Sequence, residues 1–346
     1  MVKGESVAHE SPAMIPSRPM SALRLDAPGT PLVLTQLPRP VAGPGEVLVR
    51  ILAAGINPLD TKIRAGQAAH ARQPAPAVLG IDMSGTVEAV GDGVEGFAPG
   101  DAVYGMTGGV GGVQGSMAEF ASVDARLLAL APSRLPLARV AALPLAFITA
   151  WEGLVDRARV QPGQSVLVHG GAGGVGSMAV QLAVARGARV VATGSAAQLA
   201  TINALGATAV DRRLENIEAI VREYTNGEGF DVVYDTLGGA TLDASFVAAR
   251  RYGGHVVSSL GWGTHSLAPL SFRAATYSGV FTLMPLLSGI GREQHGHIMA
   301  EATRLADAGK LVPVLSAQRF RLTDGNAALD LVESGHSAGK VIVTLP

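Results

Sequence analysis

Two stretches of the chain carry glycines at the spacing G-x-G-x-x-G, which can form a tight turn that presents backbone N–H groups to a phosphate. They are Gly171–Gly176 and Gly91–Gly96. Such a phosphate-binding turn needs a strand that leads into it and a helix that leads out, with the helix N-terminus and its dipole facing the anion. The flanking residues therefore decide which stretch can do this chemistry.

The flanks of the first stretch meet that requirement. The apolar run Val166–Val168 precedes it, and the segment Ser177–Ala185 that follows has apolar side chains at helical spacing and no helix breaker. After the second stretch, Pro99 and Gly100 would stop a helix. We expect an ordinary turn at Gly91–Gly96 and a dinucleotide pyrophosphate site at the first stretch, with a turn that binds nothing as the alternative. The residues expected to hold the pyrophosphate are Gly171, Gly173, Gly174, Val175 and Gly176.

The end of the next apolar run bears on which dinucleotide would bind. A carboxylate at this position accepts the adenosine ribose hydroxyls of NAD, whereas the run Arg189–Thr193 ends in Gly194 and Ser195. A small residue leaves room for the 2′-phosphate of NADPH. The following run ends in Asp211-Arg212-Arg213, and Arg212 can supply a cation to that phosphate. NADPH is therefore favoured over NADH, with a solvent-exposed basic edge as the alternative interpretation of Arg212.

Composition narrows the classes of protein that fit. The chain has 346 residues, enough for about two domains. Its 27 Lys and Arg balance 28 Asp and Glu, so it has no overall positive charge for binding nucleic acid. It contains no cysteine, which removes disulfides, thiolate metal ligands and cysteine nucleophiles. Nucleic acid is not an expected partner, and any zinc site would need His and carboxylate ligands alone.

The sequence predicts neither membrane insertion nor export. Mean hydropathy is +0.31, yet no run reaches the roughly 18 uncharged apolar residues of a membrane-spanning helix. The most apolar segment, Val140–Trp151, is short and contains Pro144. Residues 1–19 mix charged residues with three prolines and have no apolar core of a signal peptide. We expect them to be a disordered tail, and the protein to be cytoplasmic with no membrane partner.

Strand-like runs and helical segments divide the rest of the chain. Short β-rich runs separated by Gly and Pro fill residues 20–145, which is typical of a compact β-rich domain. Between residues 165 and 283, six apolar runs alternate with helical segments, as in a doubly wound parallel sheet. The strands of that sheet are predicted at 165–169, 189–193, 207–210, 230–235, 255–260 and 280–283.

The last part of the chain is expected to return to the first domain. It contains a helical segment at 295–308 and strand-like runs at 311–314 and 341–345. The predicted fold class is therefore α/β. It combines a β-rich catalytic domain (residues 20–145 and 285–346) with a doubly wound Rossmann domain for the dinucleotide (residues 146–284).

Further motifs resemble the medium-chain dehydrogenase/reductase superfamily, specifically its zinc-independent quinone oxidoreductase and enone reductase branch. The resemblance covers the chain from about Ser21 to the C-terminus. Its carriers include GINPLD at 55–60, LGIDMSG at 79–85, GDAVYG at 100–105, the block at 163–181, DTLGG at 235–239 and Gly339-Lys340. The resemblance implies that the β-rich domain is GroES-like.

The same comparison implies a site without zinc. Where the zinc-dependent relatives carry a cysteine ligand this chain has Asn57, and where they carry Gly-His-Glu it has Gly80-Ile81-Asp82. His295 and His297 with Glu293 could form a metal cluster, but we expect these side chains to be solvated at the start of a surface helix. No metal site is predicted.

The resemblance also implies roles for individual residues. Lys62, in Asn57-Pro58-Leu59-Asp60-Thr61-Lys62, is similar to a lysine that reaches the substrate carbonyl and the nicotinamide ribose in some enone oxidoreductases. Asn57 would position the ribose or the carbonyl, and Asp60 would orient Lys62 or cap a helix. A solvated lysine and a structural asparagine are the alternatives. The family lines its nicotinamide pocket at the positions of Thr149, Gly261, Phe281 and Leu283, which could also be ordinary strand-end residues.

An acceptor that is already electrophilic suits such a site, because no metal is needed to hold an alkoxide. Hydride from nicotinamide can add to the β-carbon of an α,β-unsaturated carbonyl compound or a quinone while the protein aligns the reactants and stabilises the enolate oxygen. We predict an NADPH-dependent quinone or enone oxidoreductase with its site in a cleft between the domains, forming a homodimer as the family often does. The glycine-rich segment Gly105–Gly115 could close over that cleft. The alternatives are an enoyl-thioester reductase and a non-catalytic NADPH-binding redox sensor or scaffold.

Overall fold

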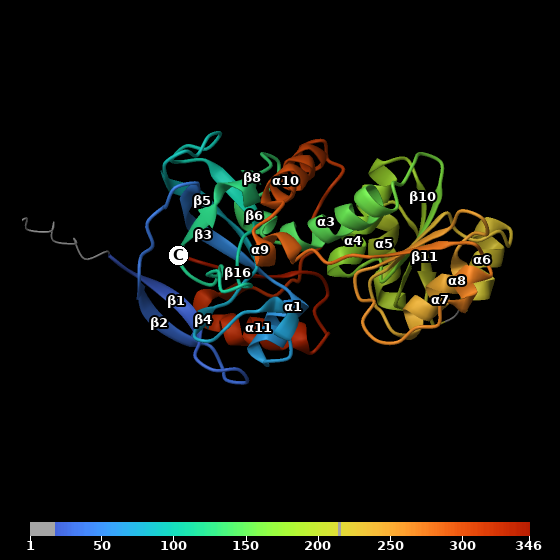
Figure 1. Ribbon diagram of the computed structural model, residues 1–346, viewed down its shortest axis with the longest axis horizontal. Helices are drawn as coiled ribbons and strands as arrows, with labels where there is room; N and C mark the ends of the chain where they lie inside the picture. Colours follow the sequence, from blue (N-terminus) through green and yellow to red (C-terminus); the bar gives the residue numbers. More distant parts are fainter. Residues whose placement is uncertain (1–17, 214–215) are drawn as a thin grey trace, which may run out of the picture.

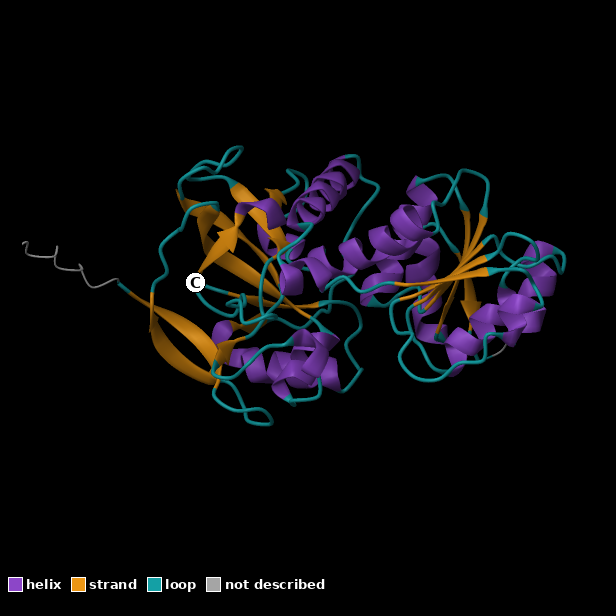
Figure 2. Cartoon of the chain, viewed as in Figure 1, coloured by secondary structure: helices purple, strands orange, loops and turns teal. Residues whose placement is uncertain are grey.

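The computed structural model describes residues 18–213 and 216–346, which form two lobes side by side (Figure 1). One lobe is rich in strands, and the other holds a sheet with helices around it (Figure 2). The predicted α/β class, with a β-rich domain and a doubly wound domain, is confirmed. Most of the expected tail at residues 1–19 lies outside the described residues, and Pro19 already begins the first strand.

Two sheets build the β-rich lobe. Its strands are β1 (Pro19–Leu25), β2 (Val33–Pro38), β3 (Glu46–Ile56), β4 (Ala77–Val78), β5 (Asp82–Val90), β6 (Ala102–Met106), β7 (Phe120–Asp124), β8 (Leu128–Leu130), β15 (Phe320–Arg321) and β16 (Val341–Thr344). The smaller sheet has the order β2-β1-β4, and the larger has the order β15-β16-β3-β5-β6-β8, with β7 also paired with β3. Apolar side chains of β3 and β5 form the centre of the core of this lobe.

The end of the chain completes the larger sheet. β16 runs antiparallel to β3, with Val341 opposite Ile56. The strand predicted at 341–345 is confirmed, but the one predicted at 311–314 is wrong, because these residues belong to no strand of the described chain. In the described part of the chain, the N–H of Lys340 donates to the carbonyl oxygen of Val314, and the N–H of Ser316, beyond the predicted strand, donates to that of Lys340. These bonds form an isolated bridge at Leu315, which is too short a contact for a ladder.

The second lobe contains six parallel strands. They are β9 (Ser165–His169), β10 (Arg189–Gly194), β11 (Thr208–Asp211), β12 (Val232–Asp235), β13 (His255–Ser258) and β14 (Thr276–Gly279). Their order, β11-β10-β9-β12-β13-β14, is that of a doubly wound dinucleotide-binding sheet, with the topological switch point beside β9. The helices of this lobe are α4 (Gly174–Ala185), α5 (Leu199–Ala204), α6 (Ile217–Thr225), α7 (Ala240–Ala248) and α8 (Ala268–Ser271). Val166–Val168 are fully buried, as expected for a strand covered by helices on both faces.

The sixth strand lies earlier than its prediction at 280–283. Gly279 pairs with Ser258 at the end of β13, so the chain leaves the sheet there. The apolar side chains of Val280 and Leu283 are buried after the strand has ended, whereas the strand itself is a partly exposed edge. Residues 281–283 therefore lie beyond the carboxyl edge of the sheet, where doubly wound folds bind their ligands.

A buried helical segment joins the lobes. α3 (Pro144–Trp151) continues directly into a π-helical stretch, Glu152–Arg157, that leads to β9. π-helical turns are uncommon and occur frequently at functional sites. The other helices of the β-rich lobe and the junction are α1 (Pro58–Arg64), α2 (Leu137–Val140), α9 (Met284–Ser288), α10 (Arg292–Asp307) and α11 (Gly325–Glu333). Within the described residues, no helix has the length and apolar character that crossing a bilayer requires.

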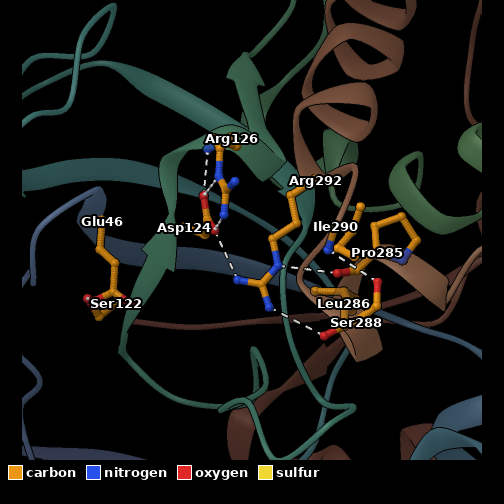
Figure 3. Close-up of polar contacts among 9 residues, drawn as sticks. All are labelled: Glu46, Ser122, Asp124, Arg126, Pro285, Leu286, Ser288, Ile290 and Arg292. Carbon is orange, nitrogen blue, oxygen red and sulfur yellow. Dashed lines mark hydrogen bonds and ion pairs between the residues drawn. The ribbon is translucent and has the colours of Figure 1, made fainter.

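Arg292 fixes the chain where it returns to the β-rich lobe (Figure 3). Its guanidinium group donates to Oδ2 of Asp124 at 2.9 Å and to the carbonyl oxygens of Pro285 and Leu286, both at 3.3 Å. Burial alone would raise the pKa of Asp124, but hydrogen bonds from Arg126 and Arg292 outweigh it and lower the pKa to about 2. The Asp124 carboxylate is therefore charged at neutral pH and stays paired with Arg292.

Candidate active site

The stretch Gly171–Gly176 forms a tight turn between β9 and α4. A Cβ atom at Gly176 would overlap the carbonyl oxygen of Gly170, and one at Gly171 would lie 2.6 Å from the Cβ of Ala192. These two glycines therefore let the helix and the neighbouring strand approach closely. A Cβ at Gly174 would meet nothing within 4 Å, so this part of the turn faces open space. The stretch Gly91–Gly96 forms turns with no helix after it, as predicted.

The N-terminus of α4 fits a bound diphosphate. Its N-cap is Gly173, which has no side chain to occupy the first N–H groups of the helix. The helix then continues without interruption for 12 residues, so its dipole adds to the positive potential at the turn. Val175 and Gly174 belong to the first turn of this helix. The backbone of residues 173–176 could therefore hold the pyrophosphate of a dinucleotide.

His169, the last residue of β9, is a buried residue of this site that no sequence motif marks. Its Nδ1 lies 3.2 Å from the hydroxyl of Thr193, and its carbonyl oxygen accepts a hydrogen bond from Thr236. Burial lowers the pKa of His169 to about 4. The ring is therefore neutral at pH 7 and braces the strand ends beneath the glycine turn.

The structure brings Gly194, Ser195 and Arg212 together beside the glycine turn. Gly194 pairs with Asp211 across β10 and β11, and its carbonyl oxygen accepts the N–H of Arg212 at 3.0 Å. A Cβ at Gly194 would lie 2.6 Å from Cδ1 of Ile202. A side chain at Gly194 would crowd Ile202 of α5. Because the residue is glycine, no carboxylate stands at this strand end. The Arg212 side chain is exposed.

Thr149 lies near the end of α3, at the junction of the lobes. Its hydroxyl donates to the carbonyl oxygen of Leu145 at 2.6 Å and lies 3.1 Å from the hydroxyl of Thr282. Thr282 in turn donates to Oε2 of Glu152 at 3.1 Å. The buried hydroxyl of Tyr234 donates to the carbonyl oxygen of Thr149 at 2.8 Å. These contacts hold Thr149 in one position between α3 and the parallel sheet.

Gly261, Phe281 and Leu283 lie beyond the ends of β13 and β14. A Cβ at Gly261 would overlap the hydroxyl of Tyr277, so a larger residue there would need the Tyr277 side chain to shift. Leu283 is buried and precedes α9. The Phe281 ring is 6.2 Å from that of His70, centroid to centroid. Because His70 belongs to the β-rich lobe, Phe281 makes contact across the junction.

Asn57 is buried in a network that the sequence did not reveal. Its Nδ2 donates to Oδ2 of Asp82 at 3.0 Å, and its Oδ1 accepts from the ammonium group of Lys340. Lys340 also lies 3.1 Å from the same Asp82 oxygen. Oδ1 of Asp82 accepts the backbone N–H of Leu145 in the first turn of α3. The network thus ties three distant segments of the β-rich lobe to the helix that carries Thr149.

The short helix α1 separates Lys62 from this network. Its Lys62 side chain is exposed, whereas Asp60 is fully buried and accepts the backbone N–H of Asn57 at 2.8 Å. Asp60 therefore caps the start of α1, which is one of its two expected roles. Burial raises the pKa of Asp60 to about 7.

The expectation that His295 is solvated is wrong. α10 begins at Arg292, so His295 lies in its first turn on the face packed against the junction, and it is fully buried. Its Nε2 is 3.6 Å from Oε1 of Glu152. His297 and Glu293 are exposed, as expected. Within residues 18–213 and 216–346, no group of three His, Cys, Asp or Glu side chains is arranged to hold a metal ion.

The predicted site residues thus fall into three places. The glycine turn lies with Gly194, Ser195 and Arg212 at the carboxyl ends of β9, β10 and β11. Thr149, Gly261, Phe281 and Leu283 lie near the junction. Lys62 and Asn57 share α1 and its N-cap, but only Lys62 is exposed.

A parallel sheet with this strand order and a glycine turn, joined to a β-rich lobe, defines the class of two-domain dinucleotide-binding dehydrogenases and reductases. Two family models match the chain: an alcohol dehydrogenase GroES-like domain over residues 43–133 and a zinc-binding dehydrogenase over residues 205–343. The chain belongs to the medium-chain dehydrogenase/reductase superfamily, and the resemblance to its zinc-independent quinone oxidoreductase and enone reductase branch is confirmed.

Two curated relatives are similar over most of their length. A 2-methylene-furan-3-one reductase from Solanum lycopersicum is 36% identical over 306 residues, covering 86% of this chain and 71% of the relative. A chloroplastic NADPH-dependent alkenal/one oxidoreductase from Arabidopsis thaliana is 35% identical over 306 residues, covering 86% of this chain and 72% of the relative. One name describes a reductase and the other an oxidoreductase.

Two solved structures share the fold. An alcohol dehydrogenase superfamily protein from Novosphingobium aromaticivorans has a TM-score of 0.93 and 54% identity, covering 94% of this chain and 100% of that one. The CurK enoyl reductase has a TM-score of 0.83 and 27% identity, covering 94% of this chain and 99% of that one. The arrangement of the two lobes is therefore one that crystallised relatives also adopt.

Proposed function

We propose that the chain is an NADPH-dependent reductase of α,β-unsaturated carbonyl compounds and quinones that works without a metal. The observation that carries the proposal is the glycine turn: a helix N-terminus with a glycine N-cap, open space at Gly174, and no carboxylate at the end of the next strand. This arrangement suits a diphosphate and an adenosine ribose that carries a 2′-phosphate.

Arg212 supports the choice of NADPH. Its backbone is fixed to Gly194, and its exposed guanidinium group can reach toward a phosphate on the neighbouring ribose. The relative named as an NADPH-dependent alkenal/one oxidoreductase points the same way. Ser195 adds a hydroxyl at the same strand end, although in this structure it contacts the side chain of Gln198.

The network around Asp82 supports a conjugated acceptor over an alcohol. Asn57 stands where the zinc-dependent relatives are expected to carry a cysteine ligand, and Asp82 where they are expected to carry the Glu of Gly-His-Glu. Here the two side chains hydrogen-bond each other, and the charge of Asp82 is balanced by the ammonium group of Lys340. The polar atoms of these side chains therefore already have hydrogen-bond partners within the protein. A conjugated carbonyl suits such a site because its β-carbon accepts hydride without prior removal of a hydroxyl proton.

NADPH, when bound, supplies a hydride to the β-carbon of the acceptor. The residues at the glycine turn and at the junction would fix the two reactants in line, which can be worth about 7–11 kcal/mol. The exposed ammonium group of Lys62 would donate to the oxygen on which enolate charge develops, and one such donor is worth about 2.7–4 kcal/mol. Thr149 would orient the nicotinamide end, because its own position is fixed by three protein groups.

Reduction of an enoyl thioester is the second candidate function, favoured by the overlap with the CurK enoyl reductase. The two candidates share hydride addition to a β-carbon and differ in the group that carries the carbonyl. A crotonyl thioester of N-acetylcysteamine therefore belongs in the same assay as a simple enone.

The test is NADPH oxidation by the purified chain with ethylideneacetone, benzoquinone and the crotonyl thioester. We expect turnover with the enone and the quinone, and a loss of about 100-fold in kcat/KM in the Lys62→Ala variant. Lys62→Arg keeps the positive charge and should recover part of the loss, while the Kd for NADPH changes by no more than about twofold in either variant. Turnover of the thioester alone would establish the second candidate, and binding of NADPH without any turnover would contradict both.

The homodimer and the cytoplasmic location stay predictions. The edges of the parallel sheet are β11 and β14, and the family resemblance predicts pairing through such an edge. Sedimentation at equilibrium decides between a monomer and a dimer.

A further inference from the structure

Three aromatic rings meet where the β-rich lobe faces the carboxyl edge of the parallel sheet. The centroids of His70 and Trp262 are 5.0 Å apart with the rings tilted by 35°. Phe281 lies edge-on to both, 6.1 Å from Trp262 and 6.2 Å from His70. We call His70, Trp262 and Phe281 the aromatic triangle.

Each corner of the aromatic triangle comes from a different part of the fold. Trp262 lies in the loop after β13, and Phe281 lies just past the end of β14. These strands are parallel neighbours, so both residues lie at the edge of the sheet where ligands bind. His70 lies six residues beyond the end of α1, the helix that carries Lys62. The aromatic triangle therefore connects the nucleotide-binding lobe to the segment that holds the proposed oxyanion donor.

The His70 corner is held in place by the glycine-rich segment. The N–H of Gly111 donates to the carbonyl oxygen of Ala71 at 2.9 Å. Gln73 accepts from the N–H of Gly112 at 2.9 Å and donates to the carbonyl oxygen of Val113 at 3.2 Å. These bonds fix the residues that directly follow His70, so its ring is carried by a braced segment.

Trp262 is the exposed corner of the aromatic triangle. Trp262 is 54% exposed, whereas His70 and Phe281 are partly buried. Aromatic side chains contribute large flat contact areas, and offset-stacked or edge-to-face partners are favoured over other geometries. An exposed indole braced by two other rings at a ligand-binding edge is therefore suited to receive a further flat group.

We propose that Trp262, backed by His70, is a stacking wall for the acceptor, and that the preferred substrates are enones or quinones whose conjugated plane extends into an aryl ring. This inference rests on the proposed function and adds the substrate class to it. Conjugation keeps the aryl ring coplanar with the C=C–C=O unit, so stacking of the ring also fixes the plane of the β-carbon for hydride addition. Short alkyl enones offer no such surface.

The kinetic test compares two methyl ketones that differ only in the group on the β-carbon, benzylideneacetone with a phenyl and ethylideneacetone with a methyl. We expect a lower KM for benzylideneacetone, and in Trp262→Ala a rise of about tenfold for it against less than about threefold for ethylideneacetone. Trp262→Phe should restore most of the preference. If the aromatic triangle only locks the lobes together, Trp262→Ala will raise both KM values by the same factor, which would overturn the proposal.

A spectroscopic test does not depend on turnover. The chain has two tryptophans, so in Trp151→Phe the emission comes from Trp262 alone. Saturable binding of benzylacetone should shift that emission to shorter wavelength, while methyl propyl ketone should not, and Trp262→Phe should show no shift with either ketone. An unchanged spectrum with benzylacetone would contradict the stacking wall. If no enone is reduced but the shift occurs, the proposed function fails and the aryl-binding wall stands.

Discussion

The ammonium group of Lys340 lies 3.1 Å from Oδ2 of Asp82, and both side chains are buried. These residues are 258 positions apart in the chain, and Asn57 contacts both. The pair therefore joins the segment before the last strand to the start of β5. Because Asp82 also accepts the N–H of Leu145 at the start of α3, the pair helps to set the position of the helix that carries Thr149.

Removing one partner of this pair should be costly. Lys340→Met leaves the Asp82 carboxylate buried without its cation, and loss of one member of a buried ion pair typically costs about 3–5 kcal/mol. We expect a fall of this size in the free energy of unfolding measured in urea at pH 7.5. The double variant Lys340→Met/Asp82→Asn removes the charge as well and keeps an acceptor for Leu145, so it should recover part of the loss. If the loss of stability in the double variant equals the sum of the losses in Lys340→Met and Asp82→Asn, the two side chains do not interact.

Of two alanine substitutions in the glycine turn, one should weaken NADPH binding and the other should lower stability. Gly174→Ala adds a methyl group to open space, so the fold should tolerate it, but the methyl would intrude where the diphosphate is expected. The Kd for NADPH should rise by about tenfold or more with little change in stability. Gly176→Ala places its methyl against the carbonyl oxygen of Gly170 and should cost about 1–3 kcal/mol of stability. Unchanged NADPH binding in Gly174→Ala would place the nucleotide elsewhere.

Arg212 and its neighbour Arg213 form a matched pair for cofactor choice. Both are exposed, but only Arg212 donates its N–H to Gly194 at the end of the second strand. A hydrogen bond to a charged group is worth about 1.5–3 kcal/mol. Arg212→Ala should therefore raise the Kd for NADPH by roughly 10- to 100-fold and leave the Kd for NADH nearly constant. The same loss in Arg213→Ala would assign the effect to general positive charge.

Asp60 should make stability depend on pH. Burial raises its pKa from the ordinary value of 3.8 to about 7, so between these values the folded state binds a proton that the unfolded state has released. Its contribution to stability is complete below about pH 4 and is lost as the pH rises through about 7. Asp60→Asn keeps an acceptor for the N–H of Asn57 and removes the titration.

Urea unfolding of Asp60→Asn and the wild type at pH 5 and pH 8 tests this assignment. The variant should gain stability relative to the wild type on going from pH 5 to pH 8, by about 2.5 kcal/mol, because only the roughly two pH units between pH 5 and the raised pKa contribute. A difference between the two proteins that is the same at both pH values would contradict the raised pKa.

Local signals were sufficient to predict the parallel sheet and its glycine turn. A strand, a turn and a helix that follow one another carry their determinants within about 20 residues, as in Val166–Ala185. The prediction of the sixth strand is wrong because the most apolar residues are not the ones that pair. Val280 and Leu283 are buried at the junction, whereas Thr276–Gly279 pairs along a partly exposed edge.

The networks of the site depend on contacts that no local pattern encodes. In the sequence, Lys340 and Asp82 resemble any other charged residues. They meet because the last strand, β16, pairs with β3. The expectation that His295 is solvated follows from its predicted place at the start of a surface helix. Its burial depends instead on which face of α10 packs on α3, and no local pattern encodes that contact. The aromatic triangle likewise requires that the two lobes meet in their native arrangement.

The proposed reaction delivers hydride to the β-carbon of a conjugated carbonyl compound. The most direct measurement uses NADPH carrying deuterium at C4 with benzylideneacetone, followed by NMR of the product. We expect one deuterium on the β-carbon of benzylacetone and an intact ketone. Deuterium on the carbonyl carbon of an allylic alcohol would contradict the proposed reaction and identify a carbonyl reductase instead.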